Sequence, residues 1–200
     1  HLAALADIVP SIQQPDEYFR ANVDGTFNVL RASQAAEIDR FVYVASSSSY
    51  GIPDVYPTPE SSEIRPQYPY ALTKHLGEEL VLHWAKVYRL PALTLRFFNV
   101  YGPREYYKGK TSSMVIQLGH QILDGKAPRL FEDSDKISRD FIYIDDVIQA
   151  NIKACTPKHN GTYNVGTGIS RNFQEIADIL QKELDTDLGT EYFPNPYNGY

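Results

Sequence analysis

The sequence has 200 residues, of which 42% are hydrophobic and 22% are charged, and its formal net charge at pH 7 is −6. This acidic balance, with no basic run to offset it, argues against a nucleic-acid binder, and no apolar stretch is long enough to predict a membrane partner. The single cysteine, Cys155, excludes an intramolecular disulfide and fits a reducing, cytoplasmic location.

Helical and strand patterns alternate along the chain. Apolar positions recurring at intervals of three and four residues indicate helices, and short continuous apolar runs indicate strands of a parallel sheet covered on both faces. In chain order, the pattern predicts an apolar strand end at 1–7, a helix at 16–36, a strand at 41–45, a loop at 53–69, a helix at 70–88, a strand at 92–97, a helix at 112–124, strands at 129–131 and 139–144, a helix reaching about residue 155, a strand at 162–165 and a helix at 172–184. This alternation predicts an α/β fold with a mainly parallel sheet.

Two residues of the helix predicted at 70–88 form a recognisable acid–base pair. Tyr70 and Lys74 are four residues apart, so their side chains share one helix face. Free tyrosine titrates near ~10, and a nearby ammonium favours its phenolate form. Ser46, at the end of the strand predicted at 41–45, is placed to hydrogen-bond a substrate oxygen that the tyrosine deprotonates. A Tyr-x-x-x-Lys pattern also arises by chance in helices, so its meaning depends on the surrounding motifs.

Gly166-Thr167-Gly168 follows a predicted strand and precedes a predicted helix, which invites a dinucleotide-binding interpretation. The segment lacks the third glycine of that fingerprint and lies far from the start of the chain, so a tight turn is favoured. The five histidines are scattered, and the sequence therefore indicates no metal site.

Several short motifs follow one another in a recognisable order. They are His1-Leu2-Ala3-Ala4, Asn22-Val23-Asp24-Gly25-Thr26, Val44-Ala45-Ser46-Ser47-Ser48-Ser49-Tyr50-Gly51, the Tyr70/Lys74 pair, Phe98-Asn99-Val100-Tyr101-Gly102-Pro103-Arg104 and Arg139-Asp140-Phe141-Ile142-Tyr143. With these motifs the chain resembles, along essentially its full length, the extended short-chain dehydrogenase/reductases, and among them the NAD(P)-dependent nucleotide-sugar epimerases and dehydratases. Each motif alone is weak, whereas all of them in the family's order are specific.

The resemblance implies a Rossmann-like, doubly wound parallel sheet with a smaller C-terminal substrate-binding region. Residues 1–100 are expected to form the C-terminal portion of the dinucleotide-binding Rossmann domain, and residues 101–200 to interleave substrate-binding segments with a returning Rossmann strand and helix. The family's first strand–helix turn with its Gly-x-x-Gly-x-x-Gly motif, the residue that selects NAD or NADP, and the C-terminal helix have no counterpart in the sequence. We therefore expect the 200 residues to belong to a longer enzyme.

The resemblance also implies roles for individual residues. It implies catalytic roles for Ser46, Tyr70, Lys74 and Lys108, contacts with NAD or NADP for Leu2, Ala3, Ala4, Asn22, Ala45, Tyr70, Lys74, Phe98 and Val100, and contacts with the nucleotide sugar for Ser47, Asn99, Phe131, Glu132 and Arg139. The alternative for Lys108 is a solvated loop lysine. A homodimer or larger homo-oligomer is expected, formed through the helix after Asp16 and the helix that carries Tyr70.

The residues after Ser46 narrow the expected reaction. The family's 4,6-dehydratases place an Asp-Glu pair directly after the catalytic serine or threonine, whereas Ser47 and Ser48 stand here and cannot serve as acid or base near pH 7. We therefore expect an epimerase, which oxidises the sugar transiently to a keto or aldehyde intermediate and re-reduces it on the other face.

Two epimerase types stay open at this point. The second half, Asn99 through Tyr143, is most similar to ADP-glycero-manno-heptose 6-epimerases, with Lys108 as their second base, and the first half is more similar to UDP-hexose 4-epimerases. The substrate is thus an ADP- or a UDP-sugar. The alternative from another class is a catalytically silent nucleotide- or sugar-binding member, or an inactive fragment, of the same fold.

Overall fold

The chain divides into two units, and the structure, a computed structural model, describes residues 1–156 and 160–195 of it. Unit 1 comprises residues 1–98 and 145–165, and unit 2 comprises residues 99–144 together with the described residues from 166 onward. The chain thus leaves unit 1 after Phe98 and returns to it for one helix and one strand.

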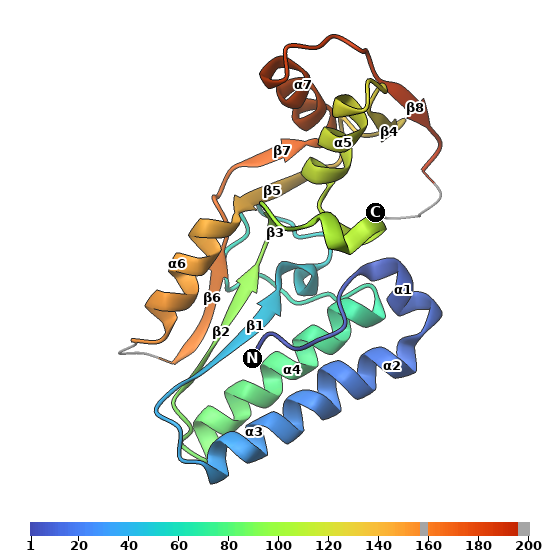
Figure 1. Ribbon diagram of the computed structural model, residues 1–200. Helices are drawn as coiled ribbons and strands as arrows, with labels where there is room; N and C mark the ends of the chain where they lie inside the picture. The colour runs from blue at the N-terminus through green and yellow to red at the C-terminus, as the bar shows by residue number, and fades with distance from the viewer. Residues whose placement is uncertain (157–159, 196–200) are drawn as a thin grey trace. The chain divides into compact units, whose positions relative to one another are not determined.

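Unit 1 is built on a parallel sheet with the strand order β1-β2-β6 (Figure 1). Phe41 of β1 lies opposite Ala92 of β2, and Leu93 of β2 lies opposite Gly161 of β6. The elements of this unit are α1 (Ile8–Gln13), α2 (Pro15–Phe19), the π-helical segment η1 (Arg20–Asp24), α3 (Gly25–Ala35), β1 (Phe41–Ser46), the 3-10 helix η2 (Ser47–Tyr50), α4 (Pro69–Val87), β2 (Ala92–Phe97), α6 (Ile144–Ala154) and β6 (Gly161–Val165).

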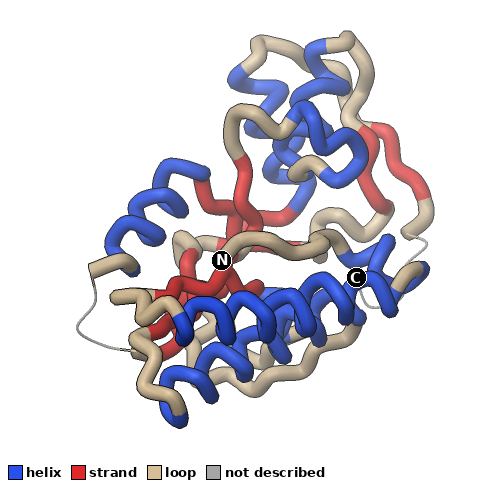
Figure 2. The backbone as a smooth tube through the Cα atoms, turned by 60° about the horizontal axis from the view of Figure 1, so that its bottom comes forward, coloured by secondary structure: helices blue, strands red, loops and turns tan. Residues whose placement is uncertain are grey.

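The core of unit 1 lies between β1 and two helices. The run α2–η1–α3 packs along α4, and both Figure 1 and Figure 2 show these helices side by side. The buried cluster at this junction consists of Leu30, Phe41, Tyr43, Ala45, Val81, Trp84, Leu90 and Ala92. Burying a large apolar side chain contributes ~1.5–3 kcal/mol, so this cluster fixes α4 firmly against the sheet.

Proline places the start of α4. Pro69 occupies the first turn of the helix, where its fixed φ is compatible with helical geometry and its missing N–H costs no hydrogen bond. Tyr68 before it is extended, with φ −131° and ψ 156°. Tyr70 and Lys74 consequently lie in the first two turns of α4.

Unit 2 contains two small sheets and two helices that pack together. Its elements are β3 (Asn99–Tyr101), the 3-10 segment η3 (Tyr106–Thr111), α5 (Met114–Leu123), β4 (Arg129–Phe131), β5 (Ser138–Tyr143), β7 (Ser170–Asn172), α7 (Phe173–Glu183) and β8 (Glu191–Phe193). β3 pairs with β5 in parallel, β5 with β7 antiparallel, and β4 with β8 in parallel. The core of this unit consists of Leu118, Leu130, Ile137, Phe173, Ile176 and Ala177.

The predicted α/β fold with a parallel sheet is confirmed, and so are the long predicted helices and the buried strands. The helix predicted at 172–184 begins with a capping box, in which the Asn172 and Glu175 side chains each accept a hydrogen bond from the other residue's backbone N–H. The sequence analysis missed α1, the π-helical turn η1 and the short strands β3, β7 and β8. These segments are too short to show a period in the sequence: local backbone hydrogen bonds define α1 and η1, and pairing with distant strands defines β3, β7 and β8.

The segment 1–7 is not a strand. Only His1 pairs with β1, through its amino group to the Val42 carbonyl at 2.6 Å and through its carbonyl from the Val44 N–H at 3.2 Å. The following residues run as an irregular segment into α1.

The tight turn predicted at Gly166-Thr167-Gly168 is confirmed. Gly168 has φ 76°, a conformation that favours glycine. The Asp140 carboxylate accepts hydrogen bonds from the Thr167 N–H at 3.0 Å and the Gly168 N–H at 2.8 Å. These amides therefore hold a carboxylate of the same unit.

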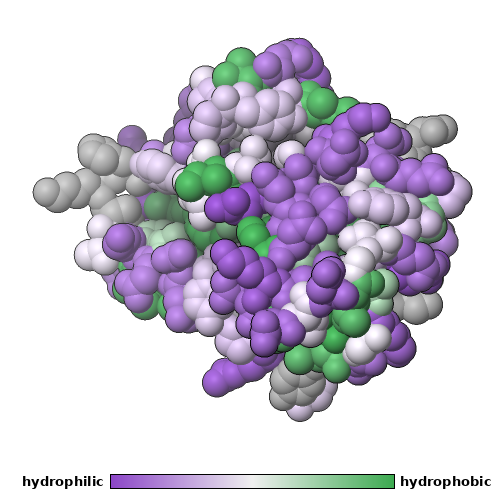
Figure 3. All heavy atoms as spheres, turned by 90° about the horizontal axis from the view of Figure 1, so that it is seen from above, coloured by the Kyte–Doolittle hydropathy of each residue, from purple (hydrophilic) through white to green (hydrophobic). Residues whose placement is uncertain are grey.

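The surface agrees with an acidic, polar chain. The face drawn in Figure 3 carries mostly hydrophilic side chains, with hydrophobic ones in small separate groups. Among the described residues, no helix combines the length and the apolar character needed to cross a lipid bilayer.

Candidate active site

Ser46 ends β1 at the carboxyl edge of the sheet. Its hydroxyl accepts a hydrogen bond from the Ser48 N–H at 3.2 Å and lies 2.8 Å from the Ser48 hydroxyl. In this position it caps the 3-10 helix η2, as serine does at many helix starts. The cap fixes where the Ser46 side chain points.

Ser46 and Tyr70 are brought together although they are far apart in sequence. The Ser46 hydroxyl lies close enough to the Tyr70 phenol to lower its pKa. The edge of the Tyr18 ring packs against the Tyr70 ring, with centroids 6.4 Å apart. Two of the three residues predicted from the serine run and the Tyr-x-x-x-Lys pattern thus lie close together.

The environment of Tyr70 differs from the sequence expectation. Burial raises the pKa of the Tyr70 phenol, the nearby Ser46 hydroxyl acts in the opposite direction, and the Asp7 carboxylate adds to the rise. The expectation that Lys74 lowers this pKa is not met in the structure. The reason is that the lysine side chain extends toward Tyr43, where its ammonium lies 4.5 Å from the ring centroid.

Lys74 is an almost fully buried cation, with 3% of its surface exposed. Burial lowers the pKa of its ammonium to about 8, and the Glu78 carboxylate acts in the opposite direction. Among the described residues, no carboxylate lies within ion-pair distance of its Nζ, which leaves the ammonium hydrogens for other acceptors. Such a group fits a ligand rich in hydroxyl oxygens, as the ribose of NAD is.

Asn22 ties the segment 1–7 to α4. Its Oδ1 accepts from the Leu5 N–H at 2.7 Å, and its Nδ2 donates to the Leu5 carbonyl and to the Thr73 hydroxyl, both at 3.0 Å. Both amide hydrogens are therefore used within the protein. Asn22 lies in the π-helical turn η1, a deviation that occurs often at functional sites.

The other residues of unit 1 expected at the cofactor or substrate lie at two places. Leu2, Ala3 and Ala4 are exposed in the segment that Asn22 holds. Ala45 is buried in β1, Ser47 is half-buried in η2, and the Phe98 N–H donates to the Val165 carbonyl at the end of β6. Their assignments to NAD or to the sugar stay predictions.

The expected substrate residues of unit 2 lie on its small sheets. The Asn99 amide donates to the Asp140 carbonyl at 3.1 Å, and the Arg139 guanidinium donates to the Ser138 carbonyl at 2.9 Å. Val100 follows Asn99 on β3. Phe131 packs against Phe193 with ring centroids 4.9 Å apart, and the next residue, Glu132, is exposed. Their roles in binding stay predictions.

Lys108 lies in the 3-10 segment η3 of unit 2. Its side chain is 56% exposed, and its Nζ lies 3.7 Å from a carboxylate oxygen of Glu105. Glu105 is buried and accepts from the N–H groups of Gly102 and Ser113 at 2.9 and 2.7 Å. The surroundings of Lys108 therefore match the solvated loop lysine, and a catalytic role stays a prediction.

The sequence analysis did not select four charged or polar residues that make contacts in the two units. In unit 1 the Tyr43 ring lies under the Lys74 ammonium, and Glu78 and Arg96 form a buried ion pair. In unit 2 Asp140 accepts hydrogen bonds from the turn at 166–168. A signal for the pair was present, because Arg96 interrupts an apolar strand and Glu78 follows Lys74 by one helical turn. A charge in a strand covered on both faces requires a partner.

One group of side chains has the composition of a metal site. His75, Glu78 and Glu79 bring ligand-type atoms within 4.8 Å of one another. Both carboxylate oxygens of Glu78 already accept hydrogen bonds from Arg96, so this group offers no free chelating carboxylate at its centre.

Comparison with known proteins finds one family and several individual proteins that this chain resembles. A family model described as the NAD dependent epimerase/dehydratase family matches residues 1–166. The UDP-glucose 4-epimerase of Mycolicibacterium smegmatis is 33% identical over 196 residues, which are 97% of this chain and 62% of that protein.

Two solved structures show the same fold. A UDP-N-acetylglucosamine 4-epimerase from Methanobrevibacter ruminantium, in complex with UDP-N-acetylmuramic acid, matches with a TM-score of 0.94 and 31% identity over 99% of this chain and 64% of that chain. The ADP-L-glycero-D-manno-heptose-6-epimerase of Helicobacter pylori matches with a TM-score of 0.87 and 34% identity over 96% of this chain and 60% of that chain. The chain thus spans between 60% and 64% of the length of these proteins.

Proposed function

The chain belongs to the NAD-dependent epimerase/dehydratase family, and from this premise we propose that the protein is an NAD-dependent epimerase of nucleotide sugars. The observation that carries the proposal is the proximity of Ser46, at the carboxyl edge of a parallel sheet, to Tyr70, with the buried ammonium of Lys74 one turn further along α4. Open α/β sheets bind their ligands at this edge.

Tyr70 and Ser46 of unit 1 have different roles in the proposed reaction. NAD, when bound, supplies a two-electron oxidant and afterwards a reductant for one carbon of the sugar. Tyr70 as phenolate removes the proton of the hydroxyl on that carbon and returns it in the second half of the reaction. The Ser46 hydroxyl hydrogen-bonds the same oxygen and orients it.

Lys74 serves as the cation of the site. Because burial raises the pKa of Tyr70, formation of the phenolate requires positive charge nearby. The Lys74 ammonium lies over the Tyr43 ring and does not itself lower this pKa in the structure, so the positively charged nicotinamide ring of NAD, when bound, would supply part of that charge. The Lys74 ammonium also has hydrogens to donate to the ribose of NAD. The protein thus supplies position and charge, while the oxidation itself is the cofactor's.

We favour a UDP-hexose 4-epimerase. In this reading the 4-keto sugar turns over between the two half-reactions and Tyr70 serves both faces, so no second base is needed. The ion pair of the exposed Lys108 with Glu105 agrees with that reading. The second candidate is an ADP-heptose 6-epimerase, because the Helicobacter pylori enzyme is 34% identical to this chain. In that enzyme type Lys108 would be the second base, acting at C6 of the sugar.

The test is turnover by the full protein, supplied with NAD and either UDP-glucose or an ADP-heptose, with the epimeric product followed by NMR. Replacing Tyr70 by Phe removes the acid–base group and is expected to lower turnover by ~10²–10⁴-fold, while Tyr88→Phe, at the C-cap of the same helix, leaves it unchanged. Lys108→Met leaves hexose turnover intact and would abolish heptose turnover. Substantial turnover by Tyr70→Phe refutes the assignment.

The assembly and location are part of the same proposal. We expect a homodimer in which α2–η1–α3 and α4 of two copies pack together, since Phe19, Phe27, Leu72 and Val87 expose apolar surface on these helices. Sedimentation of the full protein measures this. The exposed, unpaired Cys155 fits the reducing cytoplasm.

A further inference from the structure

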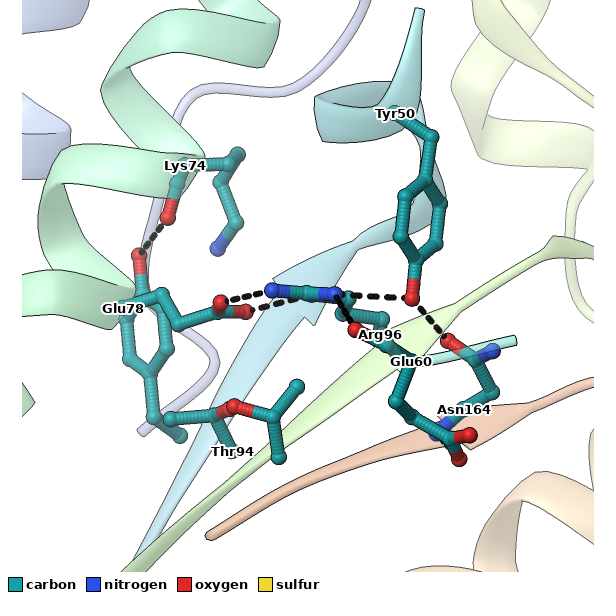
Figure 4. Close-up of polar contacts among 9 residues, drawn as sticks. Tyr50, Glu60, Lys74, Glu78, Thr94, Arg96 and Asn164 are labelled. Atoms are coloured by element: carbon teal, nitrogen blue, oxygen red, sulfur yellow. Dashed lines mark hydrogen bonds and ion pairs between the residues drawn. The ribbon is translucent and has the colours of Figure 1, made fainter. Parts of the chain in front are cut away.

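A buried ion pair lies directly beneath the lysine of the proposed site. Arg96 of β2 is 5% exposed and Glu78 of α4 is fully buried. The Arg96 Nε donates to Glu78 Oε2 at 2.9 Å, and its Nη2 donates to Glu78 Oε1 in a shorter bond (Figure 4). The two side chains thus form a bidentate pair between the sheet and the helix.

The rest of the Arg96 guanidinium reaches the turn that follows Ser46. Its Nη1 donates to the Tyr50 hydroxyl at 2.7 Å and to the Glu60 carbonyl at 3.3 Å. The Tyr50 hydroxyl in turn donates to the Asn164 Oδ1 at 2.8 Å. Since Tyr50 ends η2, one arginine connects the helix of Lys74 with the turn of Ser46.

Lys74 lies one helical turn before Glu78. Its ammonium does not bond Glu78, whose oxygens are taken by Arg96, and lies instead over the Tyr43 ring. The negative charge of Glu78 nevertheless stabilises the ammonium through space. Gly77 is required here, because a Cβ at this position would collide with the Tyr43 hydroxyl.

In this arrangement Glu78 stabilises the charge of Lys74 without occupying the hydrogens of its ammonium. If Glu78 bonded Lys74 directly, the ammonium would be tied up and turned away from a ligand. With Arg96 holding Glu78, the carboxylate contributes charge while the lysine hydrogens stay free. Two apolar side chains of similar size would fill the space of the pair at equal or lower cost in stability. Stability alone therefore does not explain why an ion pair occupies this position.

We propose that Glu78, held by Arg96, and the Tyr43 ring are positioning residues that keep the Lys74 ammonium in place over that ring and available to a ligand. The proposal deepens the proposed function, because the role of Lys74 in turnover rests on it. The electrostatic coupling itself does not depend on turnover and can be measured separately.

Several ionisable groups surround Lys74 and enter the measurement. α4 contributes Tyr70, Glu78 and, near Glu78, His75 and Glu79; β1 contributes Tyr43, β2 contributes Arg96, and the segment before α1 contributes the His1 α-amino group. Glu78 and Arg96 have opposite charges, so removing one charge or the other shifts the titration midpoint of Lys74 in opposite directions. This difference in sign distinguishes a positioning role from a merely structural one.

The experiment follows the titration of Lys74 by NMR in the full protein labelled at the lysine side chains, without cofactor, with the signal assigned by its loss in Lys74→Met. Glu78→Gln removes the negative charge and leaves Arg96 unpaired, and we expect the titration midpoint to fall by ~1 pH unit or more. Arg96→Met leaves Glu78 to stabilise Lys74 alone, so the midpoint rises. Tyr43→Leu lowers the midpoint, whereas Tyr43→Phe retains the ring and the midpoint.

Two further variants keep the test decisive. The double variant Glu78→Gln/Arg96→Met removes both charges and is expected to fold and to titrate near the wild-type midpoint, even if a single variant unfolds. Glu79→Gln, at the exposed neighbouring carboxylate, leaves the midpoint unchanged. If folded Glu78→Gln and folded Arg96→Met shift the Lys74 midpoint in the same direction, or if the double variant titrates as far from wild type as Glu78→Gln, the proposal is overturned. Absence of epimerase turnover in the wild type refutes the proposed function without touching this result.

Discussion

At the scale of single residues, the site is built around an ammonium that folding buries. Lys74 carries a charge at a place where burial lowers its pKa to about 8 from the ordinary 10.5. Burial of a charge disfavours the charged form, and only partial compensation comes from Glu78 and from the Tyr43 ring. Residues that cost stability at a site are commonly retained for function.

Replacing Lys74 by Met is therefore expected to stabilise the protein while removing turnover. Between about pH 8 and 10.5 the unfolded chain binds the Lys74 proton more tightly than the folded one, so wild-type stability rises with pH through this window. The full difference corresponds to about 3 kcal/mol. Lys74→Met is predicted to be more stable by up to this amount at pH 7, with the advantage shrinking toward pH 10.5.

Urea unfolding of the cofactor-free protein at several pH values measures the difference. Lys86→Met, at an exposed lysine of the same helix, serves as the control and should change stability by less than ~0.5 kcal/mol at every pH. A Lys74→Met advantage that is constant from pH 7 to 10.5 would contradict a lowered lysine pKa.

At the scale of elements, α4 carries most of the site. Pro69 sets its start, Tyr70 and Lys74 occupy its first two turns, and Gly77 lets the helix approach Tyr43 of β1. Glycine in a helix interior costs ~1 kcal/mol relative to alanine, so a glycine at this position indicates a steric requirement.

Gly77→Ala is predicted to destabilise the protein by ~1–3 kcal/mol, because the added methyl group collides with the Tyr43 side chain and overpacks the core. Gly119 provides the matched control. It lies in the interior of α5, and a Cβ there meets nothing within 4 Å. Gly119→Ala should therefore stabilise by up to ~1 kcal/mol through helix propensity alone. Chemical denaturation of both variants measures the contrast, and equal signs for the two would refute the steric explanation.

At the scale of the whole molecule, the described residues of unit 1 and of unit 2 form hydrophobic clusters that share no residue. The core of unit 1 contains Leu30, and the core of unit 2 contains Leu118, each with no exposed surface. Contiguous cores of this kind often open as separate cooperative units.

Leu30→Ala and Leu118→Ala are each predicted to cost ~2–5 kcal/mol, because each leaves a cavity in its own core. Native-state hydrogen exchange of the full protein should show faster exchange in α3, α4 and β1 for Leu30→Ala, and in α5 and α7 for Leu118→Ala. Equal acceleration in both units for both variants would show instead that the chain opens only as one cooperative unit.

The sequence by itself determined the fold class, the longer helices and strands and the residues with chemistry to offer. These properties are local: the apolar period of α4, the apolar run of β1 and the spacing of Tyr70 and Lys74 can be read within a few residues. The turn at Gly166 to Gly168 and the capping box at Asn172 also follow from local rules.

Only the tertiary structure decided what surrounds those residues. It placed Ser46 near Tyr70, turned the Lys74 ammonium toward Tyr43, and directed the two hydrogens of the Asn22 amide to Leu5 and Thr73. These partners come from different elements, and the position of each depends on how helices pack on the sheet. Burial then decides the energetics, because the loss of water around a charge is set by the whole fold and by no short stretch of sequence.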